Sequence, residues 1–212
     1  LYFCTSTSTG LHMNEKILIL DFGSQLTQLI GRRLRELKVY CEIYPYHHFP
    51  EPDASVKGVI LSGSPCSVKD KDAPSIDLSG IKGNIPLLGI CFGAQYLATR
   101  YGGDVHSSLS RECGRAMLNI LEPASPLFRN VSSPTTVWMS HQDSIDTLPH
   151  GTVNLASTND VQYAAFRFEG EDTYAVQFHP EVYHTIHGSR ILENFALGIC
   201  QCKGDWTPSG FI

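Results

Sequence analysis

Short apolar runs alternate with stretches of helical periodicity over the first hundred residues. Four mainly apolar runs predict buried strands at 17–20, 39–44, 58–61 and 85–90. Apolar residues recur every three or four positions at 26–37 and again at 92–101, which predicts a helix in each segment. Strands and helices that alternate in this way predict right-handed crossovers and a largely parallel sheet.

The pattern changes beyond Asp104 to shorter extended pieces separated by turns. The predicted strands of this part are 116–121, 136–139, 152–157, 163–167 and 174–178. We expect them to form antiparallel hairpins that extend the sheet. A last amphipathic helix is predicted at 188–199. The expected fold class is therefore α/β, with a central, mostly parallel mixed sheet and added antiparallel strands.

Length, composition and charge limit the class of protein. With 212 residues, 42% of them hydrophobic and 17% charged, the chain fits one globular domain. Its net charge of −5 lacks the basic footprint of nucleic-acid binders. No apolar run reaches the roughly eighteen residues that a membrane helix needs. We therefore expect no binding to nucleic acid or to a membrane.

The chain divides into three expected parts. Residues 1–13 are rich in serine and threonine, and the start Leu1-Tyr2-Phe3 resembles the remnant of an engineered protease site. We predict a tag-like, disordered leader there. The domain itself is expected at 14–200, and the polar segment 201–212 is expected to begin a linker.

The seven cysteines are odd in number and scattered, and no signal peptide precedes them. This pattern argues against a disulfide framework and predicts a reducing, cytoplasmic location. The close pair Cys200 and Cys202 lacks a second pair at zinc spacing, so we expect no metal site.

One cysteine stands in a context that favours chemistry. Cys91 lies at the expected turn between the strand 85–90 and the next helix, with Gly89 and Gly93 on either side. In such a nucleophile elbow the positive end of the helix dipole stabilises a thiolate, and backbone N–H groups face a developing oxyanion. The alternative is an inert cysteine that packs as a small apolar residue.

A histidine and a carboxylate follow the expected strand 174–178. His179 and Glu181 flank Pro180, which favours an extended backbone at His179. Residues i and i+2 of an extended segment project to the same side, so Glu181 can orient the imidazole as a general base. Taken singly, each is more simply a satisfied polar residue or a solvated charge. Together with Cys91 they predict a nucleophile, its base and an orienting carboxylate.

Two segments resemble a known family. Gly-Ile-Cys-Phe-Gly-Ala-Gln at 89–95 and Gln-Phe-His-Pro-Glu at 177–181 are similar to the signature segments of class I glutamine amidotransferases. Further segments resemble the amidotransferase domains of GMP synthetases, at 19–25, 137–141 and 199–202. The resemblance covers roughly residues 16–212. It implies a flavodoxin-like, three-layer fold and the hydrolysis of L-glutamine to glutamate and ammonia through a cysteine thioester.

The resemblance also implies roles for single residues. Cys91 would be the nucleophile, His179 the acid and base, and the backbone amides of Gly63 and Phe92 the oxyanion hole. Ser64 stands where the family usually has a second glycine. If that position takes a positive φ, serine costs roughly 1–2 kcal/mol there.

Four further residues are candidate substrate contacts. Gln95 lies one helical turn after Cys91, and a polar segment at the expected end of the strand 136–139 could offer an acceptor to the α-amino group of glutamine. The candidates are Gln95, Ser140, His141 and Asp143. Alternatively, Gln95 serves local packing and Asp143 orients a turn.

In the family, ammonia passes to an ATP-pyrophosphatase domain that adenylates xanthosine monophosphate and makes GMP. The sequence contains neither a Ser-Gly-Gly-x-Asp-Ser phosphate loop nor Walker A spacing. We therefore expect no cofactor in this chain, with ATP and magnesium belonging to an absent synthetase domain or subunit. An excised domain is expected rather than a separate subunit. The rival functions are a related Cys/His hydrolase and a catalytically silent regulatory module.

Overall fold

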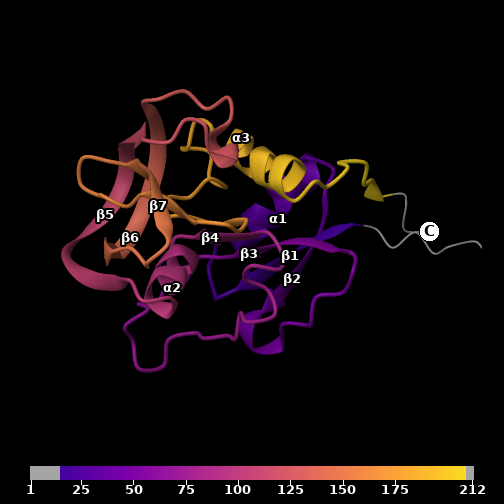
Figure 1. Cartoon of the computed structure of the whole chain (residues 1–212), viewed down its shortest axis with the longest axis horizontal. Coiled ribbons are helices and arrows are strands. Elements are labelled where there is room, and N and C mark those ends of the chain that lie inside the picture. The colour runs from indigo at the N-terminus through magenta and orange to yellow at the C-terminus, as the bar shows by residue number, and fades with distance from the viewer. Residues whose placement is uncertain (1–14, 209–212) are drawn as a thin grey trace, which may run out of the picture.

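Five parallel strands form the first part of the sheet (Figure 1). The computed structural model describes residues 15–208, except for the side chains of 108–112. The parallel strands are β1 (Lys16–Asp21), β2 (Tyr40–Pro45), β3 (Val56–Leu61), β4 (Leu87–Ile90) and β9 (Thr173–Val176). They lie side by side in the order β2-β1-β3-β4-β9. The predicted largely parallel sheet is confirmed for this part.

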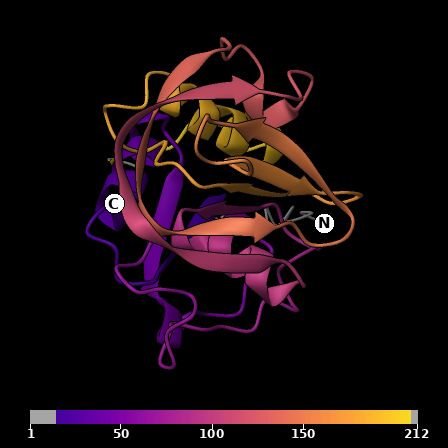
Figure 2. The same ribbon diagram turned by 90° about the vertical axis from the view of Figure 1, so that its left-hand side faces the viewer.

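Four antiparallel strands continue the sheet beyond β9. They are β5 (Asp104–Ile120), β6 (Thr135–Thr147), β7 (Thr152–Ser157) and β8 (Ala165–Phe168). The full order in the described residues is β2-β1-β3-β4-β9-β8-β7-β5-β6, which makes a nine-stranded mixed sheet. Figure 2 shows β5 as a long, curved ribbon along the outer part of this sheet.

The strands β5 and β6 are much longer than predicted. The predicted runs 116–121 and 136–139 cover only their apolar parts, whereas the two strands also pair from Asp104 to Ser107 and at Glu112 and Cys113. Polar side chains fit this ribbon because it lies at the edge of the sheet, where one face meets solvent. The prediction that Ser140 to Asp143 follow the end of a strand is therefore wrong, since these residues lie inside β6.

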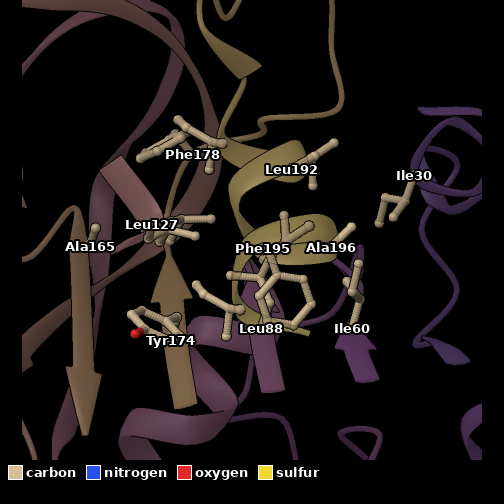
Figure 3. Close-up of a cluster of buried hydrophobic side chains, with 14 of the residues drawn as sticks. Ile30, Ile60, Leu88, Leu127, Ala165, Tyr174, Phe178, Leu192, Phe195 and Ala196 are labelled. Carbon is tan, nitrogen blue, oxygen red and sulfur yellow. The ribbon is translucent and has the colours of Figure 1, made fainter. Parts of the chain in front are cut away.

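The helices cover both faces of the sheet. They are α1 (Thr27–Glu36), α2 (Phe92–Arg100) and α3 (Gly188–Glu193). Ile17 and Ile19 of β1 join the core cluster that contains α1 and α3, whereas Leu18 and Leu20 join the cluster that contains α2. Figure 3 shows side chains of the first cluster, which packs α1 and α3 against β3 and β4. The central strands have continuous apolar sequences because both of their faces are buried under helices.

The last helical segment changes its hydrogen-bond spacing. Residues 188–199 are helical as predicted, but Asn194–Ile199 form a π-helical turn rather than a continuation of α3. The side-chain amide of Asn194 donates to the carbonyls of Leu127 (2.9 Å) and Arg129 (2.8 Å). These bonds attach the segment to the short 3₁₀ turn Pro126–Phe128; a second such turn is Tyr46–His48.

The described part of the C-terminal segment lies on the domain. Cys202 is buried in the core, and its N–H donates to the carbonyl of Ala196 (3.0 Å). The N–H of Trp206 donates to the carbonyl of Lys38 (2.9 Å). The predicted leader 1–13 and residues 209–212 lie outside the described residues. Over the described ones, none of the helices combines the length and the apolar character that spanning a membrane requires.

Two glycines let α2 approach the strands closely. A Cβ atom at Gly93 would lie 2.6 Å from the carbonyl oxygen of Leu61 in β3. A Cβ atom at Gly89 would lie 2.7 Å from the carbonyl group of Gly93. Real Cβ atoms do not come this close to backbone, so any larger residue at either position would push the helix away from the sheet.

We expect Gly93→Ala to lower the free energy of unfolding by about 1–3 kcal/mol, because its methyl group would overlap the Leu61 carbonyl. Gly198→Ala is the matched control, since no atom lies within 4 Å of a Cβ atom there. Alanine in that helical segment should be neutral or gain up to about 1 kcal/mol. Urea unfolding measures both changes. Equal stability of the two variants would show that α2 is not held at this distance.

Candidate active site

Cys91 occupies the sharp turn between β4 and α2. Its backbone angles are φ 53° and ψ −105°, a conformation that costs a non-glycine residue of the order of 1–3 kcal/mol. The N–H of Cys91 donates to the carbonyl of Val176 at the end of β9 (2.8 Å), which holds the turn in place. The predicted nucleophile elbow is present, with the thiol at the N-terminus of a helix that starts at Phe92.

The imidazole of His179 is oriented by Glu181, as the spacing of the two residues predicts. The distance from Nδ1 of His179 to Oε1 of Glu181 is 2.8 Å, and both side chains are buried. The segment is attached to β6, because the N–H of His179 donates to the carbonyl of Trp138 (3.0 Å). Thr185 adds a second link, donating to the carbonyl of His179 (2.7 Å) and accepting from the N–H of Trp138 (3.0 Å).

The charges around His179 favour its protonated form. Burial alone would lower the pKa of this imidazole. The charge of Glu181 and the hydrogen bonds to Cys91 and Glu181 outweigh burial and raise the pKa well above its ordinary value of 6.5. A protonated imidazole next to the Cys91 sulfur stabilises a thiolate, which is the nucleophilic form of cysteine.

The candidate oxyanion donors flank this pair. Phe92 is the first residue of α2, so its N–H has no partner within the helix. A Cβ atom at Gly63 would lie 3.5 Å from Cε1 of His179, which places the Gly63 backbone beside the imidazole. Ser62 fixes this stretch: its Oγ donates to the carbonyl of Gly63 (2.8 Å), and its own carbonyl accepts from the N–H of Gly93 (3.1 Å). Ser64 does not take a positive φ, so the conditional cost of serine there does not arise.

A pocket of about 280 Å³ opens in front of the thiol. All four candidate substrate contacts come together in it, whereas His179 and Glu181 are not among the residues that line it. The lining residues are Ser64, Pro65, Cys66, Ser67, Cys91, Phe92, Gln95, Cys113, Ser140, His141, Gln142 and Asp143. The volume suits a small molecule the size of an amino acid, and the lining combines polar and apolar surface.

Asp143 is the buried carboxylate of the pocket. It accepts hydrogen bonds from the hydroxyl of Ser67 and from the hydroxyl of Ser107 (2.9 Å). Because Asp143 lies inside β6, the alternative that it orients a turn is wrong. Gln95 is also buried, and its side-chain amide donates to the carbonyl of Asp143 (2.7 Å) and to Oε1 of Gln177 (3.2 Å). Gln95 thus lines the pocket and also holds β6 against α2.

His141 and Ser140 present different groups to the site. Burial lowers the pKa of His141 to about 4, so this imidazole is neutral at pH 7 and its Nδ1–H donates to the carbonyl of Asp143 (2.9 Å). The side chain of Ser140 is exposed, and its backbone carbonyl lies 3.7 Å from Sγ of Cys91.

Sequence reasoning gave no role to two residues that the structure brings to the site. Nε2 of Gln177 lies 3.8 Å from Sγ of Cys91, and Ser67 binds the carboxylate of Asp143. Gln177 precedes His179 by two positions, so the same i, i+2 argument that paired His179 with Glu181 could have found it. Nothing in the sequence near Ser67 points to Asp143. Among the side chains that the structure describes, no three potential metal ligands cluster.

The fold and this site define a class of protein. The family model of glutamine amidotransferase class-I matches residues 18–199, and the chain belongs to this family. The glutamine-hydrolyzing GMP synthases of Christiangramia forsetii and Bacteroides thetaiotaomicron are 56% and 54% identical over 200 residues. These matches cover 94% of this chain and 39% of each relative, so the chain spans about two fifths of their length.

Solved structures confirm the predicted three-layer class. One of these structures is a protein from Thermoplasma acidophilum, provisionally named as one of the subunits of a GMP synthase. It is 34% identical to this chain with a TM-score of 0.75, and the match covers 90% of this chain and 96% of that one. A glutamine amidotransferase from Thermotoga maritima shares the fold at 19% identity and a TM-score of 0.65, over 91% of this chain and 88% of that one.

We expect Glu181→Gln to lower the pKa of His179, because the amide removes the charge that stabilises the imidazolium. The raised pKa stabilises the folded protein fully below pH 6.5, and this stabilisation is lost as pH rises through the folded-state pKa. The excess stability of the wild type over the variant should therefore be largest between about pH 5 and pH 6.5, and it should shrink as pH rises from there through the folded-state pKa.

NMR titration of the imidazole measures the pKa, and urea unfolding across pH measures the stability. Glu193→Gln is the control, since Glu193 forms only a partly exposed ion pair with Arg190. A stability difference for Glu181→Gln that stays constant with pH would contradict the coupling.

Proposed function

We propose that this chain is the glutaminase part of a GMP synthase, and that it hydrolyses L-glutamine to glutamate and ammonia through a thioester on Cys91. The observation that carries this proposal is the line of buried groups from Cys91 through His179 to Glu181, set behind a pocket of amino-acid size. Membership of the class I glutamine amidotransferase family supports the reaction type. The names of the relatives support the role in GMP synthesis.

The first half of the reaction forms the thioester. The Cys91 thiolate attacks the side-chain amide carbon of glutamine, and the carbonyl oxygen becomes an oxyanion held by the N–H groups of Phe92 and Gly63. As this intermediate collapses, the imidazolium of His179 gives its proton to the leaving nitrogen, which departs as ammonia. Glu181 keeps Nε2 of the imidazole directed to the reacting atoms, because it holds Nδ1.

The second half returns the enzyme to its starting state. The neutral imidazole of His179 takes a proton from water, and the resulting hydroxide attacks the thioester carbon. The second oxyanion collapses, expels the Cys91 thiolate and releases glutamate. The imidazolium and thiolate are then both restored, which matches the raised pKa of His179.

The amino-acid end of glutamine would be bound by β6 and α2. The buried carboxylate of Asp143 lines the pocket and suits an ammonium group, while Ser140, His141 and Gln95 supply backbone and side-chain polar atoms nearby. A neutral His141 fits this role because it adds no positive charge next to the ammonium group.

The ammonia would serve the amination of xanthosine monophosphate to GMP by an ATP-pyrophosphatase domain or subunit. ATP and magnesium would bind to that part and not to this chain. The support is that the chain covers only 39% of relatives named as GMP synthases. Function in the reducing cytoplasm would keep the nucleophilic thiol available.

We expect Cys91→Ala to abolish glutamate release from L-glutamine, because no other group can form the thioester. The assay is run with this chain alone, and again with a matching synthetase part, ATP, magnesium and xanthosine monophosphate. Cys202→Ala, which removes a buried thiol remote from the pocket, is the control and should keep activity. Wild-type turnover by Cys91→Ala would overturn the mechanism. Activity on other γ-glutamyl compounds but not on glutamine would favour a different hydrolase.

We expect Asp143→Asn to raise the KM for glutamine by about 10- to 100-fold with a smaller change in kcat, because a charge-assisted hydrogen bond to the substrate ammonium group is lost. Ser107→Ala is the matched control: it removes one hydrogen bond to the same carboxylate but keeps the charge. Steady-state kinetics separates the two parameters. Equal KM values for Asp143→Asn and Ser107→Ala would contradict binding of the ammonium group at Asp143.

A further inference from the structure

Gln177 contacts the nucleophile from inside the protein. Its side chain is buried, and Nε2 of its amide lies 3.8 Å from Sγ of Cys91. Gln177 is not among the residues that line the pocket, so a substrate in the pocket leaves this contact in place. The backbone N–H of Gln177 donates to the carbonyl of Ala164 (2.8 Å), which fixes the backbone that carries the amide. The proposed hydrolysis gives this amide no role.

A chain of hydrogen bonds fixes which end of the Gln177 amide faces the sulfur. The backbone carbonyl of Asp143 can only accept, so the Gln95 atom that lies 2.7 Å from it is the nitrogen, Nε2. An amide nitrogen can only donate, so the Gln177 atom that lies 3.2 Å from this nitrogen is the oxygen, Oε1. The NH₂ end of Gln177 is therefore directed at Sγ of Cys91.

This NH₂ group has a poor partner while Cys91 is a thiol. Among the residues that the structure describes, Sγ of Cys91 is the one acceptor that Nε2 of Gln177 meets. The sulfur of a neutral thiol is a weak acceptor, whereas a thiolate accepts a charge-assisted hydrogen bond. Because a buried donor without a good partner costs free energy, the Gln177 amide favours the ionised form of Cys91.

The backbone of β6 has the opposite preference. The thiol of Cys91 donates to the carbonyl of Ser140 (3.7 Å), and this bond is lost when the thiol ionises. A hydrogen bond to the neutral form of a group disfavours its charged form, so Ser140 favours the thiol. The contact with the Gln177 amide offsets this effect.

Titratable groups from several elements also face the sulfur. The imidazole of His179 hydrogen-bonds to Cys91, and its protonated form favours the thiolate. The other titratable groups of the site are Glu181 behind His179 and the pocket-lining residues Cys66, Cys113, His141 and Asp143. The described side-chain hydrogen bonds of Gln177 reach none of these groups, so a substitution at Gln177 isolates the contribution of its amide.

We propose that Gln177 is a hydrogen-bond donor to the Cys91 thiolate. It stabilises the nucleophile before the attack and the leaving group when the thioester breaks. The proton stays on the amide nitrogen in both steps, because an amide N–H is far too weak an acid to protonate a thiolate. The bond strengthens as charge returns to the sulfur, which lowers the barrier for thioester hydrolysis. This part in turnover rests on the proposed function, whereas the bond to the thiolate does not.

The test is the rate at which iodoacetamide alkylates Cys91, measured between about pH 5 and pH 10. The thiolate displaces iodide from this reagent and the thiol does not, so the rate follows the ionised fraction. Peptide mapping reads Cys91 alone, because the tryptic peptide 83–100 contains no other cysteine. This readout needs no glutamine turnover, so its outcome is independent of the proposed function.

We expect Gln177→Met to displace the rising part of the rate profile by about one pH unit to higher pH, which is an about tenfold lower rate at a given pH there. Methionine is flexible and of similar size, but it has no N–H to donate. At about pH 10, where ionisation is complete in both proteins, the two rates should meet. A purely structural effect would instead lower the rate by the same factor at every pH.

Two further variants make the result specific. Asn194→Ala is the matched control, because it also removes a side-chain amide with two hydrogen bonds, neither of which reaches the pocket. It should leave the profile unchanged. Gln177→Glu keeps an oxygen for the Gln95 amide and, once ionised, cannot donate to the thiolate. It should displace the profile in the same direction, and it provides the test if Gln177→Met does not fold.

Coincident profiles for the wild type and the Gln177 variants, or a loss of rate that is equal at every pH, would overturn the proposal. In glutamine hydrolysis, Gln177→Met should lower kcat by about 10-fold with little change in KM, since Gln177 does not line the pocket. A displaced alkylation profile in a chain that does not hydrolyse glutamine would support the bond to the thiolate and contradict the proposed function.

Discussion

The close packing of α2 against the sheet governs the geometry of the site. Gly93 and Gly89 have no side chain where the helix passes the backbone of β3 and β4, so α2 begins immediately above the strand ends. The chain makes this turn with Cys91 at a positive φ. The thiol is consequently held at the helix N-terminus, beside the N–H of Phe92, which has no partner within the helix.

The second constraint is the burial of His179 and Glu181. A buried charge is expensive unless a partner of opposite charge lies close, and the contact between Nδ1 and Oε1 provides that partner. The balance between burial, which lowers the pKa of the imidazole, and the nearby charge, which raises it, favours the protonated state that a thiolate needs beside it. Trp138 and Thr185 hold the backbone of His179 through hydrogen bonds that carry no charge, and Glu181 orients the ring.

The ribbon of β5 and β6 supplies what the parallel sheet lacks. A parallel sheet with helices on both faces offers only its strand ends to a substrate. The ribbon curves over those ends and adds a wall that contains Ser140, His141, Asp143 and Cys113. Because this wall is attached to α2 through Gln95 and to the loop after β3 through Ser67, the pocket is a product of three chain segments rather than of one motif.

The sequence by itself determined the central strands, the helices and the pairing of His179 with Glu181. Runs such as 17–20 predict strands that are buried on both faces. The place of Cys91 between two glycines predicts a sharp turn, and the spacing of His179 and Glu181 predicts that they meet, because these signals are local. Only the tertiary structure decided the length of β5 and β6, the contact of Gln177 with Cys91, the anchoring of Asp143 by Ser67 and Ser107, and the place of Cys113 in the lining of the pocket. Polar residues at a sheet edge carry no apolar periodicity, and their partners lie tens of residues away in the chain. Their roles follow from strand register, which a single sequence does not reveal.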